Sequence, residues 1–182
     1  MSVLSGIKES VQQVAEAISI AVGLEVEIVD NKLRILGGTG YYHGRIGKEE
    51  EDGNLEGNYL YASVLRTGKT QYVEDAQNYK GYDMPVVGNT RLGELAEICT
   101  PIILKGDIIG IIGLVAFTEE QRHIILYKRE SMTVFVEKMA DLLAAKADQQ
   151  ASLENAEVIR DEMSTVLETA HEGIFERDRK GY

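Results

Sequence analysis

The 182-residue sequence predicts an α+β domain, and three observations support that prediction. Residues 5–22 place apolar side chains every three or four positions, as one face of a helix requires. Two strongly apolar runs, residues 95–104 and 108–117, are joined by Lys105-Gly106-Asp107, which suits a tight hairpin turn. From Thr118 onward the spacing is again helical. Helices that flank a sheet-forming segment indicate an α+β fold.

The first half of the chain predicts a helix, a hairpin and a long loop. The helix over residues 5–22 should end at Gly23. Residues 25–29 and 33–36 follow as paired strands. Their inward-facing residues are expected to be Val26, Ile28, Leu33 and Ile35. The glycine-rich and charged stretch that follows, residues 37–58, predicts a loop over the sheet rather than a regular element.

The middle of the chain predicts a short helix, an edge strand and a second long loop. Residues 59–67 have helical spacing and stop at Gly68, and residues 70–73 resemble an edge strand. Residues 74–93 form a loop long enough to be a candidate lid. The two apolar runs after it are expected at the centre of the sheet.

The C-terminal part predicts a long signalling helix. Thr118 and Gln121 have the spacing of a capping box. From Phe135 to Leu167 a heptad seam is interrupted by polar residues, and a continuous helix over residues 118–167 would be about 75 Å long. Such a helix needs a partner chain, so we expect a homodimer through residues 5–22 and 118–168. A solvated two-part helix with a hinge near residues 144–150 is the alternative.

Composition and charge exclude several functions. The net charge of −11, from 30 acidic and 19 basic residues, argues against a nucleic-acid surface in this chain. The N-terminus lacks the pattern of a signal peptide, and the longest apolar run is too short to cross a membrane as a helix. A single cysteine, Cys99, excludes a disulfide framework and fits a cytoplasmic protein.

Catalytic, metal and nucleotide motifs are not expected. His43, His123 and His171 are widely separated, and no nucleophile, base and orienting group can be assembled, so an enzyme is not predicted. The glycines of GTGYYHG suit a turn better than a nucleotide loop. The scattered carboxylates are interpreted as a solvated face. Neither a metal nor a cofactor is predicted.

Tyrosines near the two long loops suggest a small-molecule site, because tyrosine offers an apolar ring with a polar tip. The alternative is that they simply cover the sheet. For Cys99, the alternative interpretation is a small buried apolar residue on a central strand. Arg45 is a weaker candidate that suits an anionic ligand. The proposed ligand-binding residues are Tyr41, Tyr42, Tyr59, Tyr61, Tyr79, Tyr82, Arg91 and Cys99.

Several segments resemble a known family. VAEAISIAVGLEVEIVD, GGTGYY, VLRTGKTQYVED, ELAEICTPIILKGDIIGIIGLVAFTEEQR and VEKMADLLAAK are similar to the N-terminal GAF-like sensory domain of sigma-54-interacting transcriptional regulators. That resemblance implies an antiparallel sheet with the N- and C-terminal helices on one face. It implies a GAF-like domain over residues 1–147 and a coiled-coil-like linker over 148–168. VLETAHEGIFERDRKGY resembles the first strand of a PAS domain, which implies the start of a truncated PAS domain over residues 169–182.

The resemblance implies a sensory function. The domain would bind a small-molecule signal and pass it through a dimeric helix to PAS, ATP-binding and DNA-binding domains beyond Tyr182, which would contact RNA polymerase carrying sigma-54. Relatives often carry several cysteines before the ELAEIC segment, whereas this sequence has none there, so no metal or iron–sulfur centre is transferred to it. Alternatives are the sensory module of a histidine kinase or cyclic-dinucleotide enzyme, or a ligand-free dimerisation scaffold.

Overall fold

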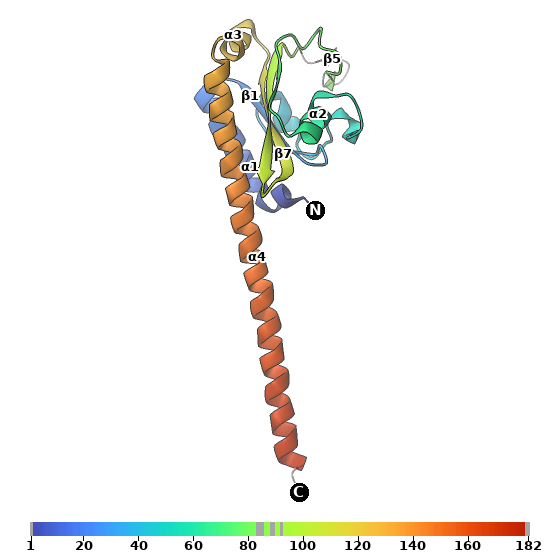
Figure 1. Ribbon diagram of the computed structural model, residues 1–182, viewed down its shortest axis with the longest axis vertical. Coiled ribbons are helices and arrows are strands. Elements are labelled where there is room, and N and C mark those ends of the chain that lie inside the picture. Colours follow the sequence, from blue (N-terminus) through green and yellow to red (C-terminus); the bar gives the residue numbers. More distant parts are fainter. Residues whose placement is uncertain (1, 83–85, 88–89, 92, 181–182) are drawn as a thin grey trace. The chain divides into compact units, whose positions relative to one another are not determined.

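The computed structural model describes residues 2–82, 86–87, 90–91 and 93–180, with side chains over 2–82 and 93–168. Its centre is a five-stranded antiparallel sheet in the order β2-β1-β7-β6-β3 (Figure 1). The strands are β1 (Glu25–Asp30), β2 (Ile35–Gly38), β3 (Gln71–Val73), β6 (Ala96–Leu104) and β7 (Asp107–Ala116), and a separate two-stranded sheet pairs β4 (Val86–Val87) with β5 (Thr90–Arg91).

The sheet confirms the predicted hairpins. Strands β6 and β7 are joined at Lys105 (φ 53°) and Gly106 (φ 94°), two successive left-handed residues of the kind that a two-residue hairpin needs. β7 is the central strand with β6 beside it, and β3 lies at an edge, as the sequence indicates.

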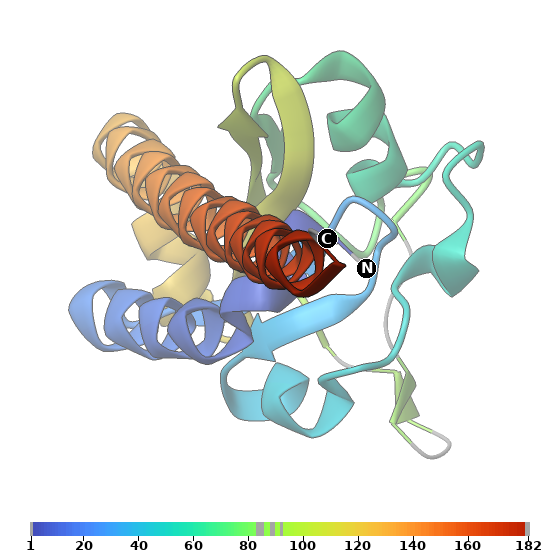
Figure 2. The same cartoon turned by 90° about the horizontal axis from the view of Figure 1, so that it is seen from below.

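One face of the sheet is covered by the N- and C-terminal helices. The helix α1 (Lys8–Val22) follows a 3-10 turn, η1 (Val3–Ile7), and ends at Gly23 with φ 73°. Its Val11 and Ile18 share a buried cluster with Ile112 of the sheet and with Leu143 of α4 (Arg129–Lys180). Figures 1 and 2 show α1 and the start of α4 together on this side. The predicted gathering of terminal helices on one face is therefore confirmed.

The opposite face is covered by α2 (Leu60–Thr67) and by the loop before it. A second buried cluster forms here from Val29, Leu33, Ile35, Leu60, Tyr61, Val64, Val73, Ala76, Cys99 and Ile111. The expected loop over residues 37–58 contains two 3-10 helices, η2 (Gly40–Arg45) and η3 (Glu51–Gly53), so the prediction that it lacks regular elements is wrong. These turns arise because the segment packs on the sheet, where its backbone groups must find local partners.

The C-terminal helix is broken once. Thr118 caps α3 (Glu119–Tyr127) with the predicted capping box, in which its hydroxyl accepts a hydrogen bond from the Gln121 amide at 3.2 Å. Lys128 leaves the helical backbone, and α4 begins at Arg129. The guanidinium of Arg129 lies 3.9 Å from the centre of the Tyr72 ring and 2.9 Å from a Glu74 oxygen. A helix continuous from Thr118 is therefore ruled out, and the break lies at Lys128 rather than near residues 144–150.

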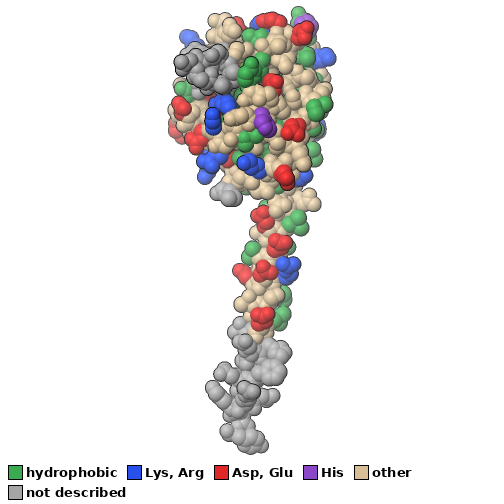
Figure 3. All heavy atoms as spheres, turned by 180° about the vertical axis from the view of Figure 1, so that it is seen from behind, with side chains coloured by type: hydrophobic (Ala, Val, Ile, Leu, Met, Phe, Trp, Pro, Cys, Tyr) green, Lys and Arg blue, Asp and Glu red, His purple; other side chains and the backbone are tan. Residues whose placement is uncertain are grey.

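The chain divides into a compact unit, residues 1–147, and a helical unit, residues 148–182. The helix α4 runs to Lys180, so the strand expected in the tail is not formed over its described part. A helix satisfies its backbone hydrogen bonds internally, whereas a strand needs a neighbour. The second unit carries the exposed acidic residues Glu154, Glu157, Asp161, Glu162 and Glu168. Figure 3 shows acidic side chains along this part of the helix. Among the described residues, no helix is long and apolar enough to span a membrane.

Candidate functional site

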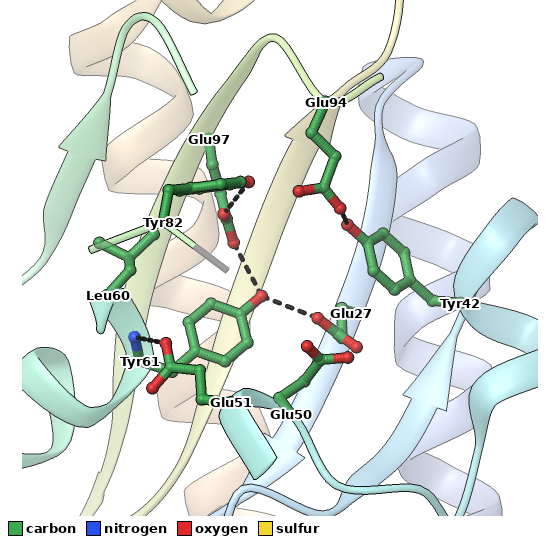
Figure 4. Close-up of a pocket in the computed structure, with 9 residues that line it drawn as sticks. All are labelled: Glu27, Tyr42, Glu50, Glu51, Leu60, Tyr61, Tyr82, Glu94 and Glu97. Carbon is green, nitrogen blue, oxygen red and sulfur yellow. Dashed lines mark hydrogen bonds between the residues drawn. The ribbon is translucent and has the colours of Figure 1, made fainter. Parts of the chain in front are cut away.

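A small pocket, partly open to solvent and with a cavity volume of about 20 Å³, lies on the face of the sheet that α2 covers (Figure 4). Carboxyl groups and tyrosine rings make up nearly all of its wall. Its lining residues are Glu27, Tyr42, Glu50, Glu51, Leu60, Tyr61, Tyr82, Glu94 and Glu97. We call them the Tyr–Glu pocket. Five carboxyl groups in one small buried space are unusual, because each loses its hydration.

Glu27 and Glu97 point into the pocket because side chains alternate between the two faces along a strand. Their neighbours Val26, Ile28 and Ile98 belong to the cluster under the terminal helices, so the glutamates must point to the other face. Both are buried, with 2% and 3% of their surface exposed. In the sheet register Glu27 pairs with Gly113, as does Cys99 on the other side of β7.

Tyr61 bridges the two strand carboxyls. Its hydroxyl oxygen lies 3.0 Å from Glu27 Oε2 and 2.7 Å from Glu97 Oε1. A phenol has one hydrogen, so both contacts are hydrogen bonds only if one carboxyl is protonated and donates to the tyrosine. Glu97 also accepts from the Tyr82 hydroxyl at 2.6 Å and from the Cys99 thiol at 2.9 Å. Three donors favour the ionised form of Glu97, which makes Glu27 the protonated partner.

The remaining carboxyls have separate partners. The Tyr42 hydroxyl donates a hydrogen bond to Glu94. Glu50 pairs with Arg45 at 2.6 Å, and both side chains are mostly buried. The Arg45 guanidinium thus already neutralises one carboxylate at the site.

Glu51 caps the helix that carries Tyr61. Its carboxylate accepts hydrogen bonds from the amides of Tyr61 at 2.6 Å and Ala62 at 2.9 Å, which satisfies first-turn donors of α2. The backbone is left-handed at Glu51 (φ 50°), Asp52 (φ 51°) and Gly53 (φ 68°). Two of these are not glycine, and strained backbone of this kind is commonly found at functional sites.

Burial raises the pKa values of these carboxyls. Desolvation raises the pKa of Glu94 to about 8 and that of Glu51 to about 7. Desolvation, followed by the charge of Glu50, raises the pKa of Glu27 well above its usual value. Desolvation also raises the pKa of Glu97, although hydrogen bonds from Cys99, Tyr82 and Tyr61 oppose that shift. The pocket therefore holds protons at neutral pH.

The structure brings together part of the predicted site. Tyr42, Tyr61 and Tyr82 line the pocket, and Cys99 lies buried beside Glu97. Three predicted tyrosines lie outside the pocket lining: Tyr41 is 53% exposed and packs on Phe117, Tyr79 is 41% exposed, and Tyr59 precedes α2. The side chain of Arg91 lies outside the described residues.

The five glutamates were missed, and the expectation that carboxylates form a solvated face is wrong for them. The sheet is covered on both faces. Strand residues that point away from the core under the terminal helices are therefore buried as well. A usable signal was present for Glu97, which interrupts a strand that is otherwise almost wholly apolar, whereas the strand of Glu27 also contains Glu25 and Asp30. Within the described part of the chain, no group of three or more His, Cys, Asp or Glu side chains could hold a metal ion.

Comparison by sequence finds one curated relative. No family model matches the chain. Over 149 residues, the chain is 33% identical to UacR of Escherichia coli, whose assigned role is that of a uric acid sigma-54-dependent transcriptional regulator. The match covers 77% of this chain and 24% of that protein, so the chain spans about a quarter of its relative.

Comparison of structures finds GAF domains. The GAF domain of a phosphoenolpyruvate-protein phosphotransferase from Coxiella burnetii matches with a TM-score of 0.62 and 16% identity, over 82% of this chain and 86% of that chain. The nlh2 GAF domain of A. aeolicus matches with a TM-score of 0.55 and 17% identity, over 81% and 85%. A free methionine-R-sulfoxide reductase from Thermoplasma acidophilum matches with a TM-score of 0.53 and 16% identity, over 80% and 96%.

Proposed function

Because this chain carries a GAF-type sensory domain of the sigma-54-dependent transcriptional regulators, we propose that the Tyr–Glu pocket binds a small-molecule signal. The observation that supports this most is the burial of five carboxyl groups around one space. Buried like charges destabilise a fold, and perturbed titratable groups in a cleft are typical of functional sites. A pocket that served only packing would be apolar.

The sheet offers a route from the pocket to the terminal helices. Glu27 lies in the pocket, whereas Val26 and Ile28 on the same strand pack in the cluster with α1 and α4. A ligand that shifts β1 or β6 therefore changes the packing under both helices. Such coupling needs a ligand that binds the two arrangements unequally.

Exposed apolar residues on α4 support a dimer. Leu142, Leu153, Met163 and Leu167 are each more than half exposed and lie on the heptad seam. Exposed Ile20 of α1 adds to the apolar surface. We propose that a homodimer covers these residues, through residues 5–22 and 118–168, and passes the signal along α4.

The output that we propose follows that of the sequence relative. UacR is about four times as long as the match, which leaves room for further domains. We propose that a PAS domain starts within residues 169–182, and that ATP-binding and DNA-binding domains beyond it contact RNA polymerase carrying sigma-54. The regulator would act in the cytoplasm, and this fragment would not itself be an enzyme. Attachment to a histidine kinase or cyclic-dinucleotide enzyme is the alternative output.

Thiol chemistry, the second candidate function, is suggested by the similarity to the sulfoxide reductase. The lone Cys99 is fully buried, and burial raises the pKa of its thiol well above the usual value. A nucleophilic cysteine needs an accessible, low-pKa thiolate. This observation favours the sensor over the reductase.

The test is ligand-induced stabilisation of the 182-residue chain. Uric acid, the compound assigned to UacR, is the first to screen, followed by other small metabolites. We expect one of them to raise the melting temperature, and Tyr42→Phe/Tyr82→Phe to abolish that rise while remaining folded. The exposed Tyr79→Phe serves as the matched control. A ligand response that survives the double substitution would remove the pocket from consideration, and no response to any compound would favour the ligand-free scaffold.

A further inference from the structure

The part of α4 beyond the compact unit, residues 148–168, carries more apolar surface than one dimer seam uses. Its large apolar residues that are each more than half exposed are Leu153, Val158, Ile159, Met163, Val166 and Leu167. Ile159 and Val166 lie off the heptad seam of the proposed dimer, directly beside it. Apolar residues that are exposed next to a seam indicate that the contact surface of this helix is wider than that seam.

The segment contains two overlapping seams, each with the three-and-four spacing of a coiled coil. The first seam consists of Gln149, Leu153, Ala156, Arg160, Met163 and Leu167. The second seam consists of Gln149, Ser152, Ala156, Ile159, Met163 and Val166. Gln149, Ala156 and Met163 belong to both seams, and the other positions differ by one residue. Because a heptad spreads seven positions around the helix, exchanging one seam for the other rotates each helix by about 50°.

We infer that the two α4 helices of the dimer pack in parallel through either seam and exchange between these two registers. The inference rests on the proposed dimer, which pairs each helix with the same segment of the second copy. A signal that favours one arrangement of the sensory domain is then passed on as a rotation of α4, and the two registers supply the two states that such a switch requires.

The charges of the segment favour a second copy of the chain as the partner of both seams. Between residues 148 and 168, Arg160 is the single charged residue on either seam. The acidic residues of the segment all lie outside both seams, and they are Asp148, Glu154, Glu157, Asp161, Glu162 and Glu168. A coiled coil keeps charges at such outer positions. A helix that lies on a membrane surface instead carries Lys and Arg along its polar face.

The two seams have similar compositions, so neither should be strongly preferred. Beside the three shared residues, the first seam buries two leucines together with Arg160. The second seam buries Ile159 and Val166 together with Ser152. Each register therefore gains two large apolar residues and accepts one polar residue, which keeps the free energies of the two registers close.

The individual side chains tolerate both registers. The Ser152 hydroxyl donates a hydrogen bond to the Asp148 carbonyl at 2.8 Å, so it enters the second seam without losing its partner. Arg160 has a long side chain that can keep its charge in water while its stem packs in the first seam. Ala156 is small and Met163 is flexible, and both properties suit positions that are shared by two packings.

Cysteine crosslinking distinguishes the seams, because a disulfide needs Cα atoms within about 7 Å of each other. Residues on the seam in use approach their copies closely, whereas residues one position aside are farther apart. Leu153→Cys reports the first seam, Ile159→Cys reports the second, and Ala156→Cys reports both. The native Cys99 is fully buried and does not interfere. We expect all three variants of the 182-residue chain to crosslink under mild oxidation, Ala156→Cys fastest.

Exchange between two registers predicts reciprocal responses to substitutions. Arg160→Leu removes the charge from the first seam, so it should speed crosslinking of Leu153→Cys and slow that of Ile159→Cys. Ser152→Leu adds apolar surface to the second seam and should do the reverse. We expect each to change the ratio of the two initial rates at least about tenfold, a difference of about 1.4 kcal/mol. Glu154→Gln, outside both seams, should leave the ratio unchanged.

The outcomes separate this inference from the proposed dimer. Crosslinking of Leu153→Cys or Ile159→Cys but not of both overturns the inference, because it shows a single register. So do substitutions that move both rates in the same direction or leave their ratio unchanged, and so does sedimentation as a trimer or tetramer, which buries a wider face at once. A dimer in which Ala156→Cys fails to crosslink overturns the inference and leaves the dimer in place. A chain that is monomeric at tens of micromolar removes the proposed dimer as well.

Discussion

Gly113 lies directly opposite Glu27 in the pairing of β7 with β1, and its missing side chain leaves the space that the Tyr61 hydroxyl occupies. A β carbon at Gly113 would lie 2.4 Å from the Tyr61 hydroxyl oxygen and 2.7 Å from Glu97 Oε1. The carboxyl network of the pocket thus depends on a glycine in the central strand.

Substituting Gly113→Ala should therefore destabilise the domain. The new methyl group must displace the Tyr61 hydroxyl from its two carboxyls, and we expect a loss of about 1–3 kcal/mol in the free energy of unfolding. Urea denaturation measures it. Gly44→Ala is the control, because a β carbon there meets nothing within 4 Å, and its effect should stay within about 0.5 kcal/mol. Equal stabilities of the two variants would contradict the role of Gly113.

The pH dependence of stability should follow the buried glutamates. The pKa of Glu94 is raised from 4.5 to about 8 and that of Glu51 to about 7, so the folded state binds these protons more tightly than the unfolded state. The resulting penalty is absent below pH 4.5, grows as pH rises and is complete above about pH 8. We expect the melting temperature to fall between about pH 5 and about pH 8.5.

Glu94→Gln tests that assignment. Glutamine keeps an oxygen that accepts from Tyr42 but cannot ionise, so the variant should gain stability at pH 8 and show a flatter pH profile. Glu56→Gln, at an exposed site, should leave the profile unchanged. A melting temperature of the unmodified chain that rises over the same range would show that other groups dominate.

Removing one partner of the buried Arg45–Glu50 pair should be strongly destabilising. Removing the cation with Arg45→Met leaves the Glu50 carboxylate buried without its 2.6 Å partner, which costs about 3–5 kcal/mol. The loss should be smaller at low pH, where the carboxyl can be protonated. Adding Glu50→Gln should restore most of the stability at pH 8. A double variant no more stable than Arg45→Met would indicate that the arginine acts through packing instead.

The proposed dimer predicts that substitutions on the heptad seam will lower the mass of the protein in solution from that of a dimer to that of a monomer. The unmodified chain should sediment as a dimer at tens of micromolar, and Leu153→Glu/Met163→Glu should shift it to a monomer, because both side chains lie exposed on the heptad seam. Glu154→Gln/Glu162→Gln, on exposed positions outside that seam, is the control. A chain that remains monomeric at this concentration would contradict the proposed signalling route.

The fold could be predicted from the sequence because local signals agree with it. Gly23 and Gly68 end their helices in the left-handed conformation, and the Thr118 capping box forms as expected. The break at Lys128 could not be predicted, since Arg129 is held by Tyr72 and Glu74, more than fifty positions away. Tertiary contacts of this kind override helical spacing.

Of the residues that line the pocket, the sequence predicted the tyrosines but not the glutamates. Tyr42, Tyr61 and Tyr82 are in or beside loops that the topology places over the sheet, so residue type and position sufficed. The glutamates required knowledge that the sheet is covered on both faces, because Glu50 and Glu51 become buried only when the loop before α2 packs down. The burial of Glu50 and Glu51 is a property of the assembled fold and has no local pattern, whereas Glu97 at least interrupts an apolar strand.

The burial of Cys99 makes this chain convenient for spectroscopy. Its thiol is inaccessible and resists ionisation, so a maleimide or nitroxide reagent should leave it unmodified while the protein is folded. A cysteine introduced at an exposed position such as Glu157 would then be the single labelled site in each subunit. Distances between two nitroxides, with and without ligand, would report whether the helices of a dimer rotate or separate when the pocket is filled.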